Sequence, residues 1–286
     1  MNPVAATAIQ GAQPQRTIEY QESGNGTPIV FVPGSFSTGA SWRSISTPLS
    51  ERYRTITTSL SGYGKTQELR RPGGNHVQDE MDVLEDVFAQ VNAPVHLVAH
   101  SFGAWVALSF AMRRTPKLLS LTLLEPTVFN LLTLGGETAL NQQVHAMTDR
   151  YMADWQSGDQ QAVRHVIDFY GGAGTFDSYP PSVQDRVISQ TPTNILDWQT
   201  GYADSTHRAD FNAVKVPTLV VYGNSSHMAM QRSNRLLVDH LPQAQIMALE
   251  GANHFMIGTH AAELTQRIDR HIRSVAPDCG CAAVRF

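Results

Sequence analysis

Ser101 is the residue of this sequence whose type and place could make it a nucleophile. It follows the apolar, strand-like run Val95–His100, and a helix-like run, Ala104–Met112, begins shortly after it. A serine at a strand-to-helix corner projects above the sheet, open to substrate and close to the positive potential of the helix N-terminus. The local pattern Ala99-His100-Ser101-Phe102-Gly103 is G-x-S-x-G with alanine at the first glycine. Alone it also describes a buried serine in an ordinary turn, so Ser101 needs supporting residues.

A serine hydroxyl is a weak nucleophile at neutral pH and needs a base within hydrogen-bond reach. His254 follows the predicted strand Gln245–Leu249. Because the carboxyl ends of parallel strands meet at one edge of a sheet, His254 can reach Ser101 there. We predict His254 as the base, with His227, which follows another predicted strand, as the alternative. His100 adjoins Ser101, but its side chain is expected to point the opposite way.

The base needs an acid to orient it, and the sequence offers one at a strand end. Glu125 follows the apolar strand Leu118–Leu124. A carboxylate that closes an apolar run is costly unless it is paired, so a histidine partner would explain it. The other expected place, the loop 223–230, contains no carboxylate before Asp239 in the following helix. We predict Glu125 as the acid; the alternative is a strand-end glutamate that points to water.

Acyl-transfer chemistry also needs two donors aimed at the developing oxyanion. The backbone N–H of Phe102, directly after the nucleophile, is the first. The second is predicted to come from the loop after the strand Pro28–Val32, where Ser35 N–H is the choice and Phe36 the near alternative. Gly34 in that loop allows a close approach of the backbone.

Composition limits the classes of function. The chain of 286 residues is 42% hydrophobic and has a formal net charge of −4. It contains neither a Lys/Arg block typical of nucleic-acid binding nor an apolar stretch near the roughly 18–20 residues that span a bilayer. Cys279 and Cys281 lie in a predicted flexible tail, 277–286, without histidines beside them. We therefore expect a cytoplasmic protein with no disulfide framework, metal or cofactor, and no nucleic-acid or membrane partner.

The elements that must position these residues alternate along the chain. Strand-like and helix-like runs predict an α/β fold, with a mostly parallel central sheet covered by helices on both faces. The predicted strands are Thr17–Ser23, Pro28–Val32, Arg54–Leu60, the run before Ser101, Leu118–Leu124, Val216–Tyr222 and Gln245–Leu249. The predicted helices of this core are Val77–Val91, the run after Ser101, Met228–Leu241 and Ala261–Val275. Residues 1–16 are expected to be a disordered lead, and 17–126 with 209–276 to form the core.

Residues 127–208 interrupt the alternation. Helical patterns at Leu140–Trp155, Gln160–Tyr170 and Val183–Ser189 predict a helical insert that could roof a site. Its large side chains suit a moderately apolar small substrate, although at helical spacing each is more often part of the insert's own core. These side chains are Phe129, Met147, Met152, Trp155, Phe169, Tyr170, Phe176, Tyr179, Trp198 and Tyr202.

From Ile18 to Val275 the chain resembles the α/β-hydrolase fold superfamily. The elbow of that family falls on Ala99–Gly103, its nucleophile on Ser101 and its histidine on His254. This sequence differs from the family pattern at three places. Pro33-Gly34 replaces the usual His-Gly, and the stretch 59–64 begins with serine where the usual Asp-x-x-Gly-x-Gly begins with aspartate. Ser226 stands where the family usually carries its catalytic aspartate. Some members of the family carry the acid at the end of the preceding strand, and in this sequence that position is Glu125. The insert resembles the helical cap of the family.

The resemblance implies a serine hydrolase that cleaves a small ester, lactone or thioester through an acyl-enzyme. Epoxide hydrolases and haloalkane dehalogenases of this fold carry an aspartate at the elbow, so Ser101 speaks against both. Two alternatives stay open: a serine carbon–carbon bond hydrolase or lyase of the same fold, and a non-catalytic protein that binds a small ligand. The sequence leaves open whether the chain forms a homodimer.

Overall fold

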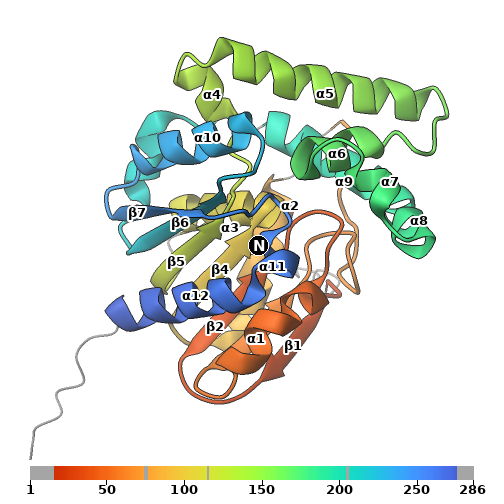
Figure 1. The fold of residues 1–286 in the computed structure, drawn as a ribbon. Coiled ribbons are helices and arrows are strands. Elements are labelled where there is room, and N and C mark those ends of the chain that lie inside the picture. The colour runs from red at the N-terminus through yellow and green to blue at the C-terminus, as the bar shows by residue number, and fades with distance from the viewer. Residues whose placement is uncertain (1–15, 74–76, 115, 204–205, 276–286) are drawn as a thin grey trace, which may run out of the picture.

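A computed structural model of the chain describes residues 16–73, 77–114, 116–203 and 206–275. The expected N-terminal lead, apart from Arg16, and the tail with Cys279 and Cys281 lie outside these residues. Within them, a central sheet is flanked by helices, and a group of helices lies beyond one edge of the sheet (Figure 1). No helix of the described part of the chain is both long and apolar enough to cross a membrane.

The described residues form a sheet of seven strands in the order β1-β3-β2-β4-β5-β6-β7. Only the pair β1 and β3 is antiparallel, and the other neighbours run parallel. The bounds are β1 Tyr20–Ser23, β2 Pro28–Val32, β3 Arg54–Thr58, β4 Val95–His100, β5 Leu118–Leu124, β6 Thr218–Gly223 and β7 Ala244–Leu249. The predicted α/β class is confirmed; the first strand begins at Tyr20 rather than Thr17.

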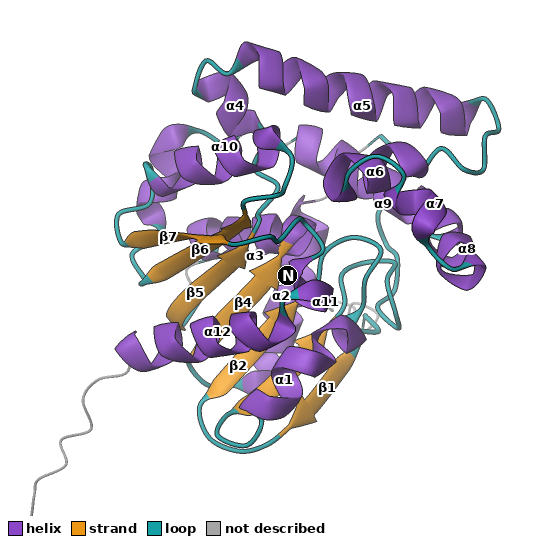
Figure 2. Ribbon diagram, viewed as in Figure 1, coloured by secondary structure: helices purple, strands orange, loops and turns teal. Residues whose placement is uncertain are grey.

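Helices cover both faces of the sheet, as the continuously apolar strands predict (Figure 2). Successive residues of β2 alternate between two cores: Val30 and Val32 join one, Ile29 and Phe31 the other. The first core receives α2 (Val77–Val91), α3 (Ser101–Arg113) and α10 (Met228–Val238). The second receives η1 (Gly39–Trp42), α1 (Arg43–Leu49), α11 (Met256–Thr259) and α12 (Ala261–Val275).

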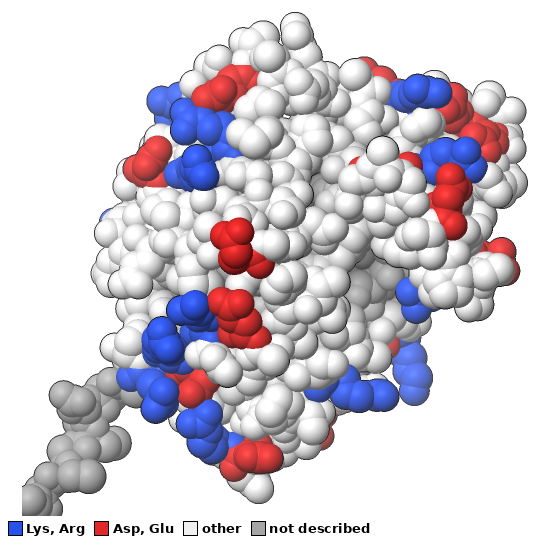
Figure 3. Space-filling model, viewed as in Figure 1, with Lys and Arg blue, Asp and Glu red and all other residues white. Residues whose placement is uncertain are grey.

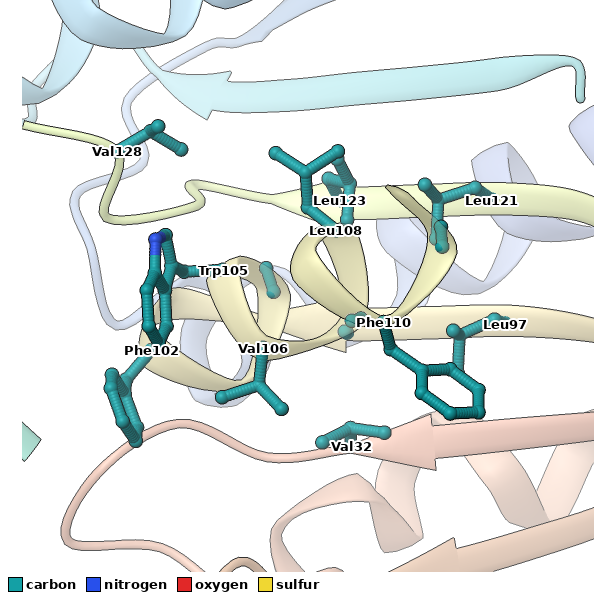
Figure 4. Packing of buried hydrophobic residues seen from close by; sticks show 14 of the residues in the cluster. Val32, Leu97, Phe102, Trp105, Val106, Leu108, Phe110, Leu121, Leu123 and Val128 are labelled. Carbon is teal, nitrogen blue, oxygen red and sulfur yellow. The ribbon is translucent and has the colours of Figure 1, made fainter. Parts of the chain in front are cut away.

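The helix after Ser101 packs tightly on the strands beneath it. Every residue of α3 from Ser101 to Met112 is buried. Figure 4 shows Val106 directed at Val32 of β2, and Phe110 beside Leu97 of β4. The helix begins at Ser101 itself, earlier than the predicted Ala104. This packing fixes the start of α3, and with it Ser101, at the carboxyl edge of the sheet.

Between β5 and β6 the chain forms a group of helices, called the cap below. They are α4 Asn130–Leu134, α5 Thr138–Gln156, α6 Arg164–Gly171, α7 Thr175–Ser178, α8 Pro181–Ser189 and α9 Thr191–Tyr202, followed by η2 Arg208–Ala213. The cap has its own apolar cluster, centred on Tyr151, Val166 and Phe176. Sequence patterns predicted α5, α6 and α8 but not α9, whose apolar residues are few and whose first turn contains Pro192.

Charged side chains of both signs are interspersed over the face drawn in Figure 3. They lie at the ends of the molecule more than in its middle, where the surface between core and cap is mostly uncharged. The formal net charge of −4 agrees with this mixture of signs.

Candidate active site

Ser101 lies at a sharp corner between β4 and α3. Its φ of 56° is left-handed, a conformation that costs a residue with a side chain about 1 kcal/mol or more and persists where the surrounding structure enforces it. The corner requires small neighbours: a Cβ on Gly103 would lie 2.1 Å from the carbonyl oxygen of Pro33, and one on Gly34 2.7 Å from the Ser101 Cβ. Ala99, in contrast, faces the core and is fully buried there, so its methyl group is accommodated.

His254 lies beside Ser101, as the strand-edge argument predicted. The Ser101 Oγ is 2.8 Å from His254 Nε2. Both residues are buried from bulk solvent but line a common cavity. The loop that carries the histidine is fixed by Asn253, whose side-chain oxygen accepts from Phe255 N–H at 3.0 Å while its amide donates to Gly171 O at 3.2 Å.

Glu125 completes a line of three side chains. It is fully buried, and its Oε2 lies 2.7 Å from His254 Nδ1. Its other oxygen, Oε1, accepts the backbone N–H of Gly223 at 2.7 Å. The residue has a φ of 45°, so the chain turns sharply as it leaves β5. Both carboxylate oxygens are therefore paired, and the water-facing alternative for Glu125 does not describe this structure.

The other candidates lie elsewhere. His227 accepts the N–H of Ala229 on Nδ1 at 3.2 Å, and its ring stacks on Phe169 with centroids 4.1 Å apart. Asp239 follows the C-terminal end of α10. Ser226, at the position where the family carries aspartate, is buried with a hydroxyl that has no hydrogen-bond partner among the described residues.

His100 contradicts the expectation that it points away from the site. Its Nε2 lies 2.9 Å from the carbonyl oxygen of His254, the two rings are 4.8 Å apart, and His100 lines the cavity. Strand alternation does direct His100 to the face opposite Ala99, but the His254 loop crosses the same edge before joining α11 and α12 on that face. Burial lowers the pKa of His100 well below its usual value, so the ring is neutral.

A cap residue contacts the imidazole. The ring of Tyr170, near the end of α6, stacks on His254 with centroids 4.1 Å apart and planes inclined by 17°. Burial raises the pKa of the Tyr170 hydroxyl well above its usual value, so this group is neutral. The sequence analysis named Tyr170 among several aromatic residues that could line a substrate pocket. No local pattern distinguished it from Phe176, which lies in the apolar cluster of the cap.

The two predicted oxyanion donors come from different segments that both adjoin Ser101: Phe102 follows it, and Gly34, next to Ser35, lies close to it. Phe102 N–H belongs to the first turn of α3, where backbone donors have no partner within the helix. Ser35 lies in the loop after β2, next to Phe36 with its φ of 58°. Both residues line the cavity with Ser101. The Ser35 side chain turns away toward the cap and donates to Asp197 Oδ2 at 2.5 Å.

A cavity of about 790 Å³ lies between the sheet edge and the cap. Five of the aromatic cap residues singled out in the sequence line it: Phe129, Tyr170, Tyr179, Trp198 and Tyr202. The others, with both methionines, are not part of its wall, and most of them pack in the cap cluster. Within the described chain, no group of three or more His, Cys, Asp or Glu side chains is arranged to hold a metal ion.

Known proteins share this fold over most of its length. Residues 29–267 match the alpha/beta hydrolase family. The 2-hydroxy-6-oxo-2,4-heptadienoate hydrolase of Pseudomonas putida is 25% identical over 82% of this chain and 84% of its own. The pimeloyl-[acyl-carrier protein] methyl ester esterase of Aliivibrio salmonicida is 22% identical over 90% of this chain and 96% of its own.

The solved structure of a thermophilic esterase from Thermogutta terrifontis superposes with a TM-score of 0.72 and 20% identity, covering 93% of this chain and 97% of that one. MenH from S. aureus gives the same TM-score at 15% identity, over 91% and 99% of the two chains. The elbow, the parallel sheet and the family match agree. The chain belongs to the alpha/beta hydrolase family.

Proposed function

We propose that this protein is a serine hydrolase that cleaves a small ester-type substrate (an ester, lactone or thioester) through an acyl-enzyme. One observation carries the proposal: Glu125, His254 and Ser101 form a continuous line of contacts of 2.7 and 2.8 Å that ends in the cavity. This order of acid, base and hydroxyl is the one that activates a serine, whatever the order along the chain.

In the proposed reaction Ser101 Oγ attacks the carbonyl carbon of the substrate while His254 Nε2 takes the hydroxyl proton. Glu125 accepts the Nδ1 proton of His254, which sets the tautomer and stabilises the imidazolium. The backbone N–H groups of Phe102 and Ser35 donate hydrogen bonds to the negatively charged oxygen of the tetrahedral intermediate. The intermediate collapses when His254 protonates the leaving group, and the acyl group remains on Ser101. Water, activated by His254, then releases the acid.

The second bond of Glu125 supports its role. A buried carboxylate is costly unless it accepts hydrogen bonds, and here Gly223 N–H and His254 occupy its two oxygens. The bond to Gly223 fixes Glu125 to the last residue of β6, so the carboxylate cannot rotate freely about its side chain. A fixed carboxylate orients the imidazole toward Ser101 throughout the reaction.

The cavity suggests the kind of substrate. Its wall is largely aromatic and aliphatic, which suits an apolar acyl or alcohol group. Arg186 of α8 is the one Lys or Arg among the described residues of the wall, and an acidic group distant from the reacting carbonyl would suit it. The name of one relative agrees with an acidic group, since it acts on a dienoate, and the name of another agrees with an ester, since it acts on a methyl ester.

Carbon–carbon bond hydrolysis is the second candidate. It is favoured by the similarity, over most of both chains, to a hydrolase of 2-hydroxy-6-oxo-2,4-heptadienoate. That compound contains no ester, so its hydrolysis must break a carbon–carbon bond. The same Ser101, His254 and Glu125 would serve this reaction.

The proposal is tested with a panel of p-nitrophenyl esters, lactones and thioesters, a 2-hydroxy-6-oxo-dienoate, and a fluorophosphonate probe that reacts with activated serines. We expect turnover of short-chain esters and a probe adduct mapped by mass spectrometry to the peptide that contains Ser101. Turnover of the dienoate alone would favour the second candidate. A folded protein that neither reacts with the probe nor turns over any substrate would refute both, and would leave the non-catalytic ligand-binding alternative.

A further inference from the structure

A buried carboxylate of the cap contacts the loop that carries the proposed oxyanion donor. Asp197 of α9 is 3% exposed. Its Oδ2 accepts the Ser35 hydroxyl at 2.5 Å and the Tyr63 hydroxyl at 2.6 Å. Its Oδ1 accepts Arg70 Nη1 at 2.6 Å. No step of the proposed reaction uses Asp197, yet three side chains of the core converge on it.

The core holds its end of this contact rigidly. The Arg70 side chain is fully buried, and so is the Glu80 carboxylate of α2, 2.8 Å from it. Arg70 also donates to the carbonyl oxygen of Ser61 at 3.0 Å and pairs with Glu68 at 2.7 Å. A buried guanidinium surrounded by such partners has one orientation, because leaving it would break charge-assisted bonds in a low-dielectric interior. Arg70 and Tyr63 therefore fix where Asp197, and with it α9, can dock.

The oxyanion loop is bonded to both the core and the cap: the Phe36 backbone is hydrogen-bonded to the Tyr63 hydroxyl, and the Ser35 hydroxyl to Asp197. Phe36, directly after Ser35, is held at a φ of 58°, which a residue with a side chain adopts only at a cost. Among the described residues, the hydrogen-bond partner of the Ser35 hydroxyl is Asp197 of the cap. The bond joins residues 162 positions apart in the sequence. The Ser35 side chain is therefore tied to a cap helix, while the next residue of the loop is bonded to the core.

We infer that Asp197 is a positioning residue that couples the docking of the cap to the assembly of the oxyanion hole. The inference rests on the proposed function, since it concerns the Ser35 donor of that reaction. When α9 is docked, the Asp197–Ser35 bond aims the Ser35 N–H at the tetrahedral oxygen. When α9 moves away, the loop loses this bond and the hole loses a correctly placed donor. Efficient turnover then requires a substrate that the cap covers.

The test compares two variants of cap–core hydrogen bonds. Ser35→Ala removes the hydroxyl bonded to Asp197 but keeps the backbone N–H and the Arg70 and Tyr63 contacts. Gln199→Ala is the matched control: Gln199 also belongs to α9 and bonds to the core, accepting Gly73 N–H at 3.3 Å, but it does not touch the oxyanion loop. Both variants, the single variant Asp197→Asn and the double variant Ser35→Ala/Asp197→Asn are assayed for ester hydrolysis, thermal unfolding, and inhibition by a phenylboronic acid and by the product acid.

We expect Ser35→Ala to lower kcat about tenfold, less than the 10²–10³-fold that follows from deleting an oxyanion donor. KM and inhibition by the product acid should change little. The affinity for the boronic acid should fall by about the same factor as kcat, because only a tetrahedral adduct places an oxygen in the oxyanion hole. Gln199→Ala should retain wild-type kcat. The loss in the double variant should be smaller than the sum of the losses in Ser35→Ala and Asp197→Asn, because both substitutions disrupt the same Asp197–Ser35 bond.

Three outcomes would overturn the coupling: a folded Ser35→Ala protein with wild-type kcat and boronic acid affinity, equal losses in Ser35→Ala and Gln199→Ala, or fully additive losses in the double variant. If the wild-type protein itself neither hydrolyses esters nor reacts with the fluorophosphonate, the proposed function fails and the coupling fails with it. A wild-type enzyme that is active beside an unaffected Ser35→Ala variant refutes the coupling alone.

Discussion

The loops at the carboxyl edge of the sheet and the cap helices above them are held in place by different means. Ser101, Glu125 and the His254 loop each follow a parallel strand, buried in β4 and in most of β5 but largely exposed in β7, and Ser101 and Glu125 have a left-handed φ. The cap contacts the same site through individual side chains, notably Tyr170 on His254 and Asp197 on Ser35. The backbone of the core thus positions the proposed reacting groups. The cap contacts these groups through individual side chains, and a single substitution can remove one such contact.

This difference predicts the largest effect at the elbow. Ser101→Ala should lower kcat for an activated ester by about 10⁴-fold or more, because it removes the hydroxyl that is paired with His254. Fluorophosphonate labelling should disappear while the far-ultraviolet circular dichroism spectrum is unchanged. Retained turnover in Ser101→Ala would show that the core edge does not carry the reaction.

Glu125→Gln should have the next largest effect. The amide cannot accept the Nδ1 proton of His254 as a carboxylate does, so the tautomer needed at Ser101 loses its support, and kcat should fall by about 10²–10⁴-fold. Asp239→Asn is the matched control, since Asp239 lies after α10, and its activity should stay close to wild type. The reverse ranking of the two variants would remove Glu125 from the proposed mechanism.

A substitution in the cap at Tyr170 should cost less. Tyr170→Leu removes the ring stacked on His254, and an aromatic pair contributes about 0.5–1.5 kcal/mol, so kcat should fall roughly two- to tenfold. Tyr170→Phe keeps the ring and should restore most of the activity. A Phe variant as slow as the Leu variant would assign the effect to the hydroxyl instead of the stacked ring.

Beneath the sheet, on the face away from α3, His96 should affect stability and not turnover. Its Nδ1 lies 2.8 Å from Ser120 Oγ, and burial together with nearby His271 lowers the pKa of His96 from 6.5 to about 4. Between these two pH values the unfolded chain binds more protons than the folded one. The free energy of unfolding therefore rises with pH over this interval, and stability is lost as pH falls through it.

His96→Gln should flatten this dependence by up to about 1.4 kcal/mol per pH unit, the slope of one proton. Urea unfolding of wild type and variant at a series of pH values from 4 to 7 measures the slope directly, independent of any constant destabilisation by the substitution. Parallel curves would show that His96 does not titrate as its burial indicates. Activity at neutral pH should be unchanged, which separates this buried histidine from those at the carboxyl edge.

Local sequence patterns predicted the core better than the cap. The strands β2 and β5 were recognised because burial on both faces leaves a continuous apolar run, and their predicted bounds Pro28–Val32 and Leu118–Leu124 agree with the structure. In the cap, α9 carries Asp197 and Trp198 yet has a weak apolar pattern, and its position depends on Arg70 and Tyr63 of the core. Side chains held by distant partners leave no periodic signal.

The sequence by itself determined the family, the α/β class and the residues at each strand end, because strand ends and elbows are marked by local apolar runs and small residues. It also led to Ser101, His254 and Glu125, whose proposed roles await the experiments above. The tertiary structure decided what no local pattern contains: that His100 faces the His254 carbonyl, that Tyr170 covers the imidazole, and that Asp197 holds Ser35. These contacts join residues from 84 to 162 positions apart in the chain, so only the folded arrangement of cap and core creates them.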